Sequence, residues 1–470
     1  MSDTEEDLQA VSAKASPSTP PIKDSPFYWN TEIARSRRKK WGWTISVWSI
    51  VFDGQFSDSN QEVKLTLETY HTDEEIKIGT LEIVPIRFLE PSIKARLINR
   101  GHTFWRCREK RLVTYSTATS DDSNVAGQRF MVDYQTYKKL HPDSQRPVDN
   151  NRNVKETGQN FHRSANPPDE PASLLFPSQT VGFNLRRKAW EDIKIDLIED
   201  VQWNKDAFSQ HLVADDDTKE LIEALVTSQL ALENSTDVIE NKEKGLIMLL
   251  HGSPGTGKTF TAEGVAEMAE KPLYPVTCGD LATKPENVEK YLESVFHLGR
   301  LWGCVVLLDE AEVFLEQRQL VDLERNALVS VFLRALEYYD GILTSNRVGT
   351  FDEAFKSRIQ LAIHYEPLKK AQRKQVWKNS FNRLERLEEG NIDFEDIRTY
   401  YDDLSIFKMD GRQIRNSITT ARQLAQFKGK KMTYSHLKHA IKVSGKFDEY
   451  LANLRNGLGD EEIAKEEGMR

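Results

Sequence analysis

Cysteine is scarce in this chain of 470 residues, which has three: Cys107, Cys278 and Cys304. They stand far apart and form no closely spaced pair, so the sequence offers neither a disulfide framework nor a structural zinc site. Long apolar runs are also missing, since no stretch approaches the about 18–20 apolar residues of a membrane-spanning helix. The sequence therefore predicts a soluble intracellular protein, cytoplasmic or nuclear, without a membrane partner.

The amino terminus lacks the features of a targeting segment, because its first 25 residues are polar, acidic and rich in proline and serine. An excess of basic residues is absent as well: 64 Lys and Arg face 73 Asp and Glu, for a net charge of −9. This balance argues against a general nucleic-acid binder. A basic cluster at 35–40, followed by Trp41 and Trp43, leaves two readings open: a nuclear or nucleic-acid signal, or a solvated entry to a strand.

Shifts in composition divide the chain into segments, since 470 residues exceed one ordinary hydrophobic core. Alternating large and polar residues between 41 and 84 predict strands. A stretch rich in Asn, Asp, Pro and Arg between 142 and 171 predicts a linker. The predicted segments are, in order, a disordered tail (1–26), a β-rich or α+β N-terminal domain (27–141), a linker (142–173), a connecting segment (174–244), a nucleotide-binding core (245–367), a helical lid (368–446) and a charged tail (447–470).

A glycine-rich loop follows the apolar run 246–250. It reads Gly252-Ser253-Pro254-Gly255-Thr256-Gly257-Lys258-Thr259, with Phe260 next in the following helix. The spacing G-x-x-x-x-G-K-T is the P-loop pattern, in which backbone N–H groups cradle phosphates. Lys258 can reach the β- and γ-phosphates, and Thr259 offers a hydroxyl to Mg²⁺. The sequence therefore predicts a site for a nucleoside triphosphate.

The segments around this loop alternate in predicted type. Strands are expected at 246–250, 273–276, 305–308 and 342–345, with helices at 258–270, 286–301 and 321–338. This alternation predicts a parallel sheet with helices on both faces, and the pattern after Pro367 is all helical. The predicted fold class is an α/β P-loop NTPase core with a C-terminal helical lid, preceded by a β-rich N-terminal domain.

Two carboxylates end the strand at 305–308. In P-loop ATPases, an acid placed like Asp309 holds Mg²⁺ and the next acid, here Glu310, polarises the attacking water. The alternative is a solvated acidic turn, which the ordered P-loop disfavours. Asn346, after the next strand, is predicted to orient that water. Arg358 is predicted to act as a finger on a neighbouring subunit's nucleotide, and Arg412 to reach over the phosphates from the lid.

These ordered motifs resemble the AAA+ ATPases over about Asp200 to Lys446, and most closely the fungal AAA proteins with a family-specific N-terminal domain. The resemblance implies ATP and Mg²⁺ as cofactors, a homo-oligomeric ring, which would be a hexamer, and an unknown protein client of the N-terminal domain. It makes Asn346 the first sensor and Arg412 the second. Arg325 and Arg334 could act across the ring interface or form surface salt bridges. The carrying segments are 309–318, 322–333, 344–348, 181–185 and 200–204, and more weakly 83–86 and 131–134.

The chain departs from the family pattern at two places. The strand from Gly341 to Asn346 is about two residues short, a loss of reach of roughly 6 Å. Either the turn before it unwinds, or Asn346 is withdrawn from the γ-phosphate. The stretch 279–285 lacks the aromatic residue of a peptide-threading loop, so threading by stacked aromatics is not expected.

Three functions remain open from the sequence. The first is a Mg²⁺-dependent ATPase that remodels a client. The second is an ATP-gated interaction scaffold with little turnover, suggested by the short strand before Asn346. The third is a DNA-associated loader, suggested by the Lys-Ser-Arg-Ile sequence at 356–359 and the basic cluster at 35–40, although nucleic acid is not the expected partner.

Overall fold

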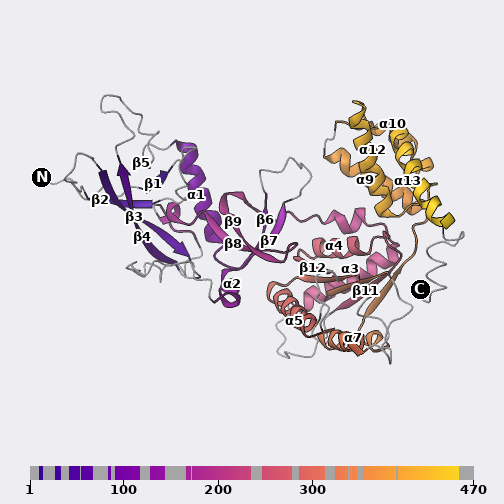
Figure 1. The fold of residues 1–470 in the computed structure, drawn as a ribbon, viewed down its shortest axis with the longest axis horizontal. Coiled ribbons are helices and arrows are strands. Elements are labelled where there is room, and N and C mark those ends of the chain that lie inside the picture. The colour runs from indigo at the N-terminus through magenta and orange to yellow at the C-terminus, as the bar shows by residue number, and fades with distance from the viewer. Residues whose placement is uncertain are drawn as a thin grey trace. The chain divides into compact units, whose positions relative to one another are not determined.

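The computed structural model describes part of the chain, which divides into two units, Met1–Val201 and Gln202–Arg470 (Figure 1). The pore-loop stretch at 279–285, apart from Pro285, and the basic cluster at 35–40 lie outside the described residues. The described residues are 10–13, 27–32, 42–52, 54, 56–66, 83–85, 90–116, 127–142, 166–170, 172–233, 246–277, 285–312, 323–336, 339, 341–346, 353–387 and 390–454.

The first unit contains two antiparallel sheets of five strands. One has the order β4-β3-β2-β1-β5, and its long hairpin pairs β3 with β4 from Gly42↔Thr66 to Phe52↔Phe56. The other has the order β10-β6-β7-β8-β9. The strands are β1 (Ala10–Ala13), β2 (Phe27–Glu32), β3 (Gly42–Phe52), β4 (Phe56–Thr66), β5 (Ile83–Pro85), β6 (Arg111–Tyr115), β7 (Gln128–Val132), β8 (Gln179–Asn184), β9 (Ala189–Lys194) and β10 (Ile198–Asp200).

Aromatic side chains fill the core of this unit. Helix α1 (Pro91–Arg106) begins with Pro91, whose fixed φ suits the first helical turn, and buries Phe104 and Trp105. Trp105 stacks on Phe56 with ring centroids 5.4 Å apart. The short helix α2 (Tyr134–Leu140) begins where the Asp133 carboxylate accepts the backbone N–H of its third residue. Burial of this aromatic cluster gives the unit its own core.

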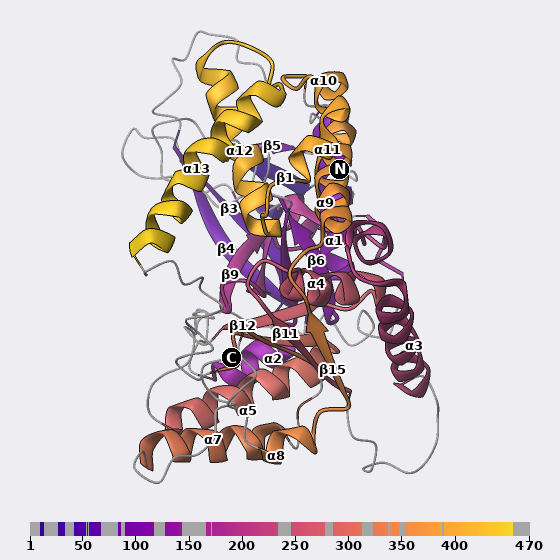
Figure 2. The ribbon, with the colours of Figure 1, turned by 90° about the vertical axis from the view of Figure 1, so that its right-hand side faces the viewer.

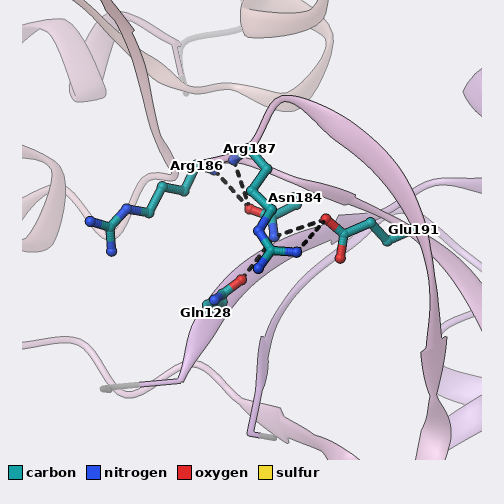
Figure 3. A network of polar contacts seen from close by, with 5 residues as sticks. All are labelled: Gln128, Asn184, Arg186, Arg187 and Glu191. Carbon is teal, nitrogen blue, oxygen red and sulfur yellow. Dashed lines mark hydrogen bonds and ion pairs between the residues drawn. The ribbon is translucent and has the colours of Figure 1, made fainter. Parts of the chain in front are cut away.

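A buried asparagine fixes the turn between β8 and β9 (Figure 3). Asn184 is fully buried, and its side-chain oxygen accepts the backbone N–H groups of Arg186 and Arg187, each at 3.0 Å. Its amide nitrogen donates to Gln128 Oε1 at 2.9 Å, and Glu191 receives both this amide and Arg187 at 3.4 Å. Asparagine suits the site because one side chain both caps a turn and bonds a neighbouring strand.

The boundary of the first unit differs from the prediction in two places. Strand β1 falls inside the predicted disordered tail of 1–26. Strands β8 to β10 were assigned to a connecting segment of 174–244, and they complete the second sheet: β10 pairs with β6, β8 with β7, and β9 with β8. The reason is visible before β8: Leu175 and Phe176 lie in the aromatic core with Trp105. Local composition did not show this long-range pairing. Because of it, the first unit extends to Val201.

This assignment predicts where a core mutation acts. Phe176→Ala should destabilise the first unit by about 3–5 kcal/mol, because it empties space beside Trp105 and Phe104. ATP affinity should stay unchanged, since the P-loop lies in the other unit. Urea unfolding measures the loss, and Phe427→Ala is the matched control, because Phe427 is 88% exposed. A loss below about 1 kcal/mol would contradict the placement of Phe176 in this core and return it to the connecting segment.

The second unit is built on a parallel sheet of order β12-β13-β14-β11-β15. Its strands are β11 (Ile247–Gly252), β12 (Leu273–Thr277), β13 (Val305–Asp309), β14 (Gly341–Ser345) and β15 (Leu361–Tyr365). Figure 2 shows α4 (Lys258–Met268) on one side of the sheet and α5 (Pro285–Trp302) and α7 (Leu323–Ala335) on the other. Helix α3 (Asp216–Glu233), the π-helix Ala207–His211 and the short α8 (Glu353–Lys356) complete the core. The predicted fold class is confirmed, although β15 was not predicted.

The lid is a bundle of helices around one apolar core (Figure 1). Its helices are α9 (Lys370–Arg386), α10 (Phe394–Thr399), α11 (Tyr401–Leu404), α12 (Gly411–Phe427) and α13 (Tyr434–Leu454). Trp377 and Phe381 of α9 stack at its centre and are almost completely buried. Helix α12 begins with a capping box, in which Asp410 and Gln413 each accept the other's backbone N–H. This box fixes the backbone at the point where α12 begins.

Candidate nucleotide-binding site

The P-loop connects β11 to α4 and has the conformation that its glycines predict. Gly252, Gly255 and Gly257 have φ of 141°, 71° and 108°, which other residues adopt only with strain. A Cβ on Gly252 would lie 2.2 Å from the carbonyl oxygen of Tyr365 in β15. One on Gly255 would lie 2.4 Å from the Asp410 carboxyl carbon. Both positions therefore need glycine, for backbone conformation and for space.

Lys258 is folded back under this loop. Its Nζ donates to the carbonyl oxygens of Gly252 at 2.8 Å and Ser253 at 2.9 Å, and the side chain is buried. Thr256 also donates to the Ser253 carbonyl, at 2.8 Å. The ammonium is thus held at the mouth of the loop by neutral carbonyl groups, which phosphate oxygens can replace as stronger acceptors.

Pro254 and Phe260, two further residues of the predicted P-loop set, differ in their exposure. Pro254 is exposed at the loop tip. Phe260 is half-buried and packs on the apolar cluster between α4 and the sheet. Its side chain supports the base of α4, and its contact with the cofactor stays a prediction.

Asp309 and Thr259 lie together at the carboxyl edge of the sheet. The Thr259 hydroxyl is 3.2 and 3.3 Å from the two carboxylate oxygens of Asp309. A hydroxyl and a carboxylate at this spacing are hard oxygen donors of the kind that Mg²⁺ takes in nucleotide sites. The two side chains therefore fit the magnesium role predicted for them. Glu310, the next residue, is exposed at the same edge and has φ of 58°.

Asn346 lies at this edge as well. In the parallel sheet, Ser345 pairs with His251, so Asn346 follows at the level of Gly252, where the P-loop begins. The choice between the two alternatives for the short strand, an unwound preceding turn or withdrawal of Asn346 from the γ-phosphate, stays a prediction. At the other end of β14, Gly341 has φ of 155°, and any Cβ there would lie 2.2 Å from the Val306 carbonyl oxygen.

The Asn346 side chain is held by an acid that the sequence did not single out. Glu312 accepts the Asn346 backbone N–H at 3.3 Å and its amide nitrogen at 3.1 Å. A carboxylate only accepts, so the amide must turn its nitrogen toward Glu312. The amide oxygen then points elsewhere and remains an acceptor for a water molecule.

The predicted arginines are placed differently from one another. Arg358 follows α8 and donates to the Ala354 carbonyl at 3.0 Å, with its side chain partly buried. Arg412 is exposed on the first turn of α12. Arg334 of α7 forms a surface ion pair with Glu289 of α5, which matches the salt-bridge alternative.

The lid contacts the P-loop through its backbone. The Gly411 N–H donates to the carbonyl oxygen of Gly255 at 2.9 Å, and the Asp410 carboxylate lies directly beside that glycine. This contact was not predicted from the sequence, although the capping-box sequence Asp-Gly-Arg-Gln at 410–413 carries the signal. The reach of Arg412 over the phosphates stays a prediction.

Two histidines pair beside the base of the P-loop. Nδ1 of His251, on β11, is 3.2 Å from Nδ1 of His364 on β15. Burial, with the charges of His364 and Lys258 adding to it, lowers the pKa of His251 to about 4. His251 therefore stays neutral at physiological pH, where one ring nitrogen donates the shared proton and the other accepts it.

This low pKa predicts acid sensitivity with a definite sign. The unfolded chain takes up a proton on His251 near pH 6.5 and the folded chain only near pH 4. Stability is thus fully present above about pH 6.5 and falls as the pH drops toward 4. The urea midpoint should fall less between pH 7 and pH 5 in His251→Gln than in the wild type. The control is His297→Gln, at an exposed histidine. An equal fall in all three proteins would contradict the assignment.

Two family models match this unit. Residues 248–367 match the model described as "ATPase family associated with various cellular activities (AAA)", and residues 368–458 match "Fungal AAA+ ATPase lid domain". Residues 248–458, which these two models match, are called the AAA+ module. The resemblance read from the sequence is confirmed for this part of the chain, including the fungal type of its lid.

Curated relatives of the AAA+ module share part of its length. Human "ATPase family AAA domain-containing protein 3B" is 27% identical over 151 residues, 30% of this chain and 23% of that protein. The zebrafish "Outer mitochondrial transmembrane helix translocase" is 28% identical over 142 residues, 27% of this chain and 37% of that protein. Each match spans less than half of either protein.

In the described part of this chain, no helix combines the length and apolarity that crossing a membrane requires.

Solved structures of similar fold include a katanin chain from a study of katanin self-assembly. It is 19% identical and aligns over 49% of this chain and 82% of its own length, with a TM-score of 0.38. The AAA domain of FIGL-1 in complex with ADP is also 19% identical, over 51% of this chain and 87% of its own, with a TM-score of 0.39.

Proposed function

We propose that the AAA+ module binds ATP with Mg²⁺ and hydrolyses it. The observation that carries the proposal is the placement of Lys258, Thr259 and Asp309, which brings an ammonium, a hydroxyl and a carboxylate to the mouth of one loop. When bound, Mg²⁺ would neutralise charge on the phosphates. Thr259 and Asp309 are the residues that would hold it.

Side chains of this module would bind the phosphates and activate the attacking water. Lys258 exchanges the Gly252 and Ser253 carbonyls for phosphate oxygens. The Glu310 carboxylate, exposed at the sheet edge, takes the proton of the attacking water as general base. The Asn346 amide oxygen, left accessible by the bond to Glu312, accepts a hydrogen bond from the same water. These roles divide phosphate binding from proton transfer.

The proposal extends to an oligomer that remodels a protein client. A ring would place Arg358 of one subunit at the nucleotide of the next, which requires its guanidinium to leave the Ala354 carbonyl. A guanidinium that stabilises charge on the transferring phosphoryl group is the usual role of such a finger. The client would be recruited by the first unit. The DNA-loader alternative stays a prediction from the sequence alone.

A scaffold that binds ATP with little turnover remains the rival. The contact of Glu312 with Asn346 favours it, because the predicted sensor is occupied by a carboxylate of its own chain. Steady-state phosphate release, measured beside ATP affinity, separates the two functions. Turnover well above that of Glu310→Gln supports the ATPase. Tight ATP binding with release no faster than in Glu310→Gln would establish the scaffold.

A further inference from the structure

One buried hydroxyl connects both acids of the site to the neighbouring strand. Thr344 is the fourth residue of β14 and is 1% exposed. Its hydroxyl donates to Asp309 Oδ1 and accepts the backbone N–H of Glu310 at 3.2 Å. Its carbonyl oxygen accepts the next backbone N–H, that of Ala311, at 2.9 Å. These bonds go to Asp309, the last residue of β13, and to the two residues of the turn that follows it.

That turn has a conformation that requires support. Glu310 has φ of 58°, in the left-handed region that residues with a Cβ adopt at a cost in energy. Two consecutive backbone N–H groups donate to Thr344. That of Glu310 donates to the hydroxyl, and that of Ala311 donates to the carbonyl oxygen. Residues in such conformations persist where the surroundings hold them. Thr344 is the residue that holds Glu310 in this one.

The surroundings of Thr344 explain why a hydroxyl at this position is informative. All five residues of β14 are buried, and its neighbours Ile342 and Leu343 are apolar. A buried hydroxyl lowers stability unless it is hydrogen-bonded, and valine would fill the same volume without that cost. The hydroxyl bonds the Asp309 side chain and the Glu310 backbone N–H, both at the carboxyl end of β13. The Thr344 hydroxyl is therefore better explained by a role in positioning Asp309 and Glu310 than by the packing of β14.

We propose that Thr344 is a positioning residue for the ATPase site, which orients the Asp309 carboxylate toward the hydroxyl of Thr259 and sets the backbone from which Glu310 projects. The inference rests on the proposed function, because it assigns Thr344 a role in holding Mg²⁺ with ATP. It predicts that Thr344 acts on the magnesium-dependent part of ATP binding and leaves the P-loop part unchanged.

The test compares Thr344→Val, which removes the hydroxyl at constant volume, with Thr344→Ser, which keeps it. ATP affinity is measured calorimetrically with Mg²⁺ and with EDTA. In Thr344→Val, the gain in affinity that Mg²⁺ gives should fall about ten- to hundredfold, as for a lost hydrogen bond to a charged group. Affinity in EDTA should change less than about threefold, and Thr344→Ser should resemble the wild type.

A second measurement separates positioning from a general structural effect. If Thr344 acts through Asp309, Thr344→Val should have little further effect on the Mg²⁺-dependent gain when Asp309→Asn is already present. Equal losses with Mg²⁺ and in EDTA, or an additive effect in the double variant, would overturn the inference. A Thr344→Val protein with the wild-type gain would also overturn it. Failure of the wild-type chain to bind ATP would instead refute the proposed function.

Discussion

Lys258→Ala should lower the affinity of the chain for ATP by at least about a hundredfold. The ammonium is the one cation of the P-loop, and it is buried with carbonyl groups that phosphate oxygens replace. A charge-assisted hydrogen bond contributes about 1.5–3 kcal/mol, and more than one such bond to the phosphates is lost together. Isothermal titration with ATP and Mg²⁺ measures the change.

The control for Lys258→Ala is Lys356→Ala, at an exposed lysine of α8. It removes the same charge from the same unit and should leave the affinity within about threefold of the wild type. Thermal unfolding of both variants checks that the P-loop variant is folded. An ATP affinity of folded Lys258→Ala close to that of Lys356→Ala would show that the nucleotide is bound elsewhere.

Glu310→Gln should retain ATP and lose turnover by at least about a hundredfold. The substitution keeps the size of the side chain and its left-handed backbone but removes the base, and general bases contribute about 10²–10⁴-fold. Phosphate release gives the rate. The nucleotide that stays with the protein through gel filtration should be ATP in the variant and ADP in the wild type.

Glu395→Gln, at an exposed acid of the lid helix α10, is the matched control for Glu310→Gln. It should hydrolyse ATP at the wild-type rate. A Glu310→Gln variant that turns over as fast as this control would remove Glu310 from the role of base and leave the proton acceptor elsewhere in the site.

The sequence predicted the phosphate-binding part of the site because that part is local. The P-loop glycines, Lys258 and Thr259 are consecutive, and their spacing alone predicts how they lie around a phosphate. Asp309 was predicted from a buried strand that ends in acids, and β14, which pairs with both β13 and β11, brings it beside Thr259. In each case a short motif contains the whole signal.

The parts that the sequence did not predict depend on register and on contacts between distant segments. Thr344 lies beside Glu310, and Glu312 beside Asn346, because β13 pairs with β14. Nothing in the local sequence of either residue indicates this contact. The lid contact of Gly411 with Gly255 joins residues over 150 positions apart. Likewise, Phe176 was assigned to a connecting segment because nothing near it in the chain reveals the core that it joins.

The central claim is that the AAA+ module forms one site for ATP with Mg²⁺. Calorimetric titration of the wild-type chain with ATP, in Mg²⁺ and again in EDTA, tests it most directly. The account predicts one ATP bound per chain, with affinity at least about tenfold higher in Mg²⁺, because Thr259 and Asp309 are placed to hold the ion. Absence of ATP binding, or an affinity that Mg²⁺ does not change, would contradict it.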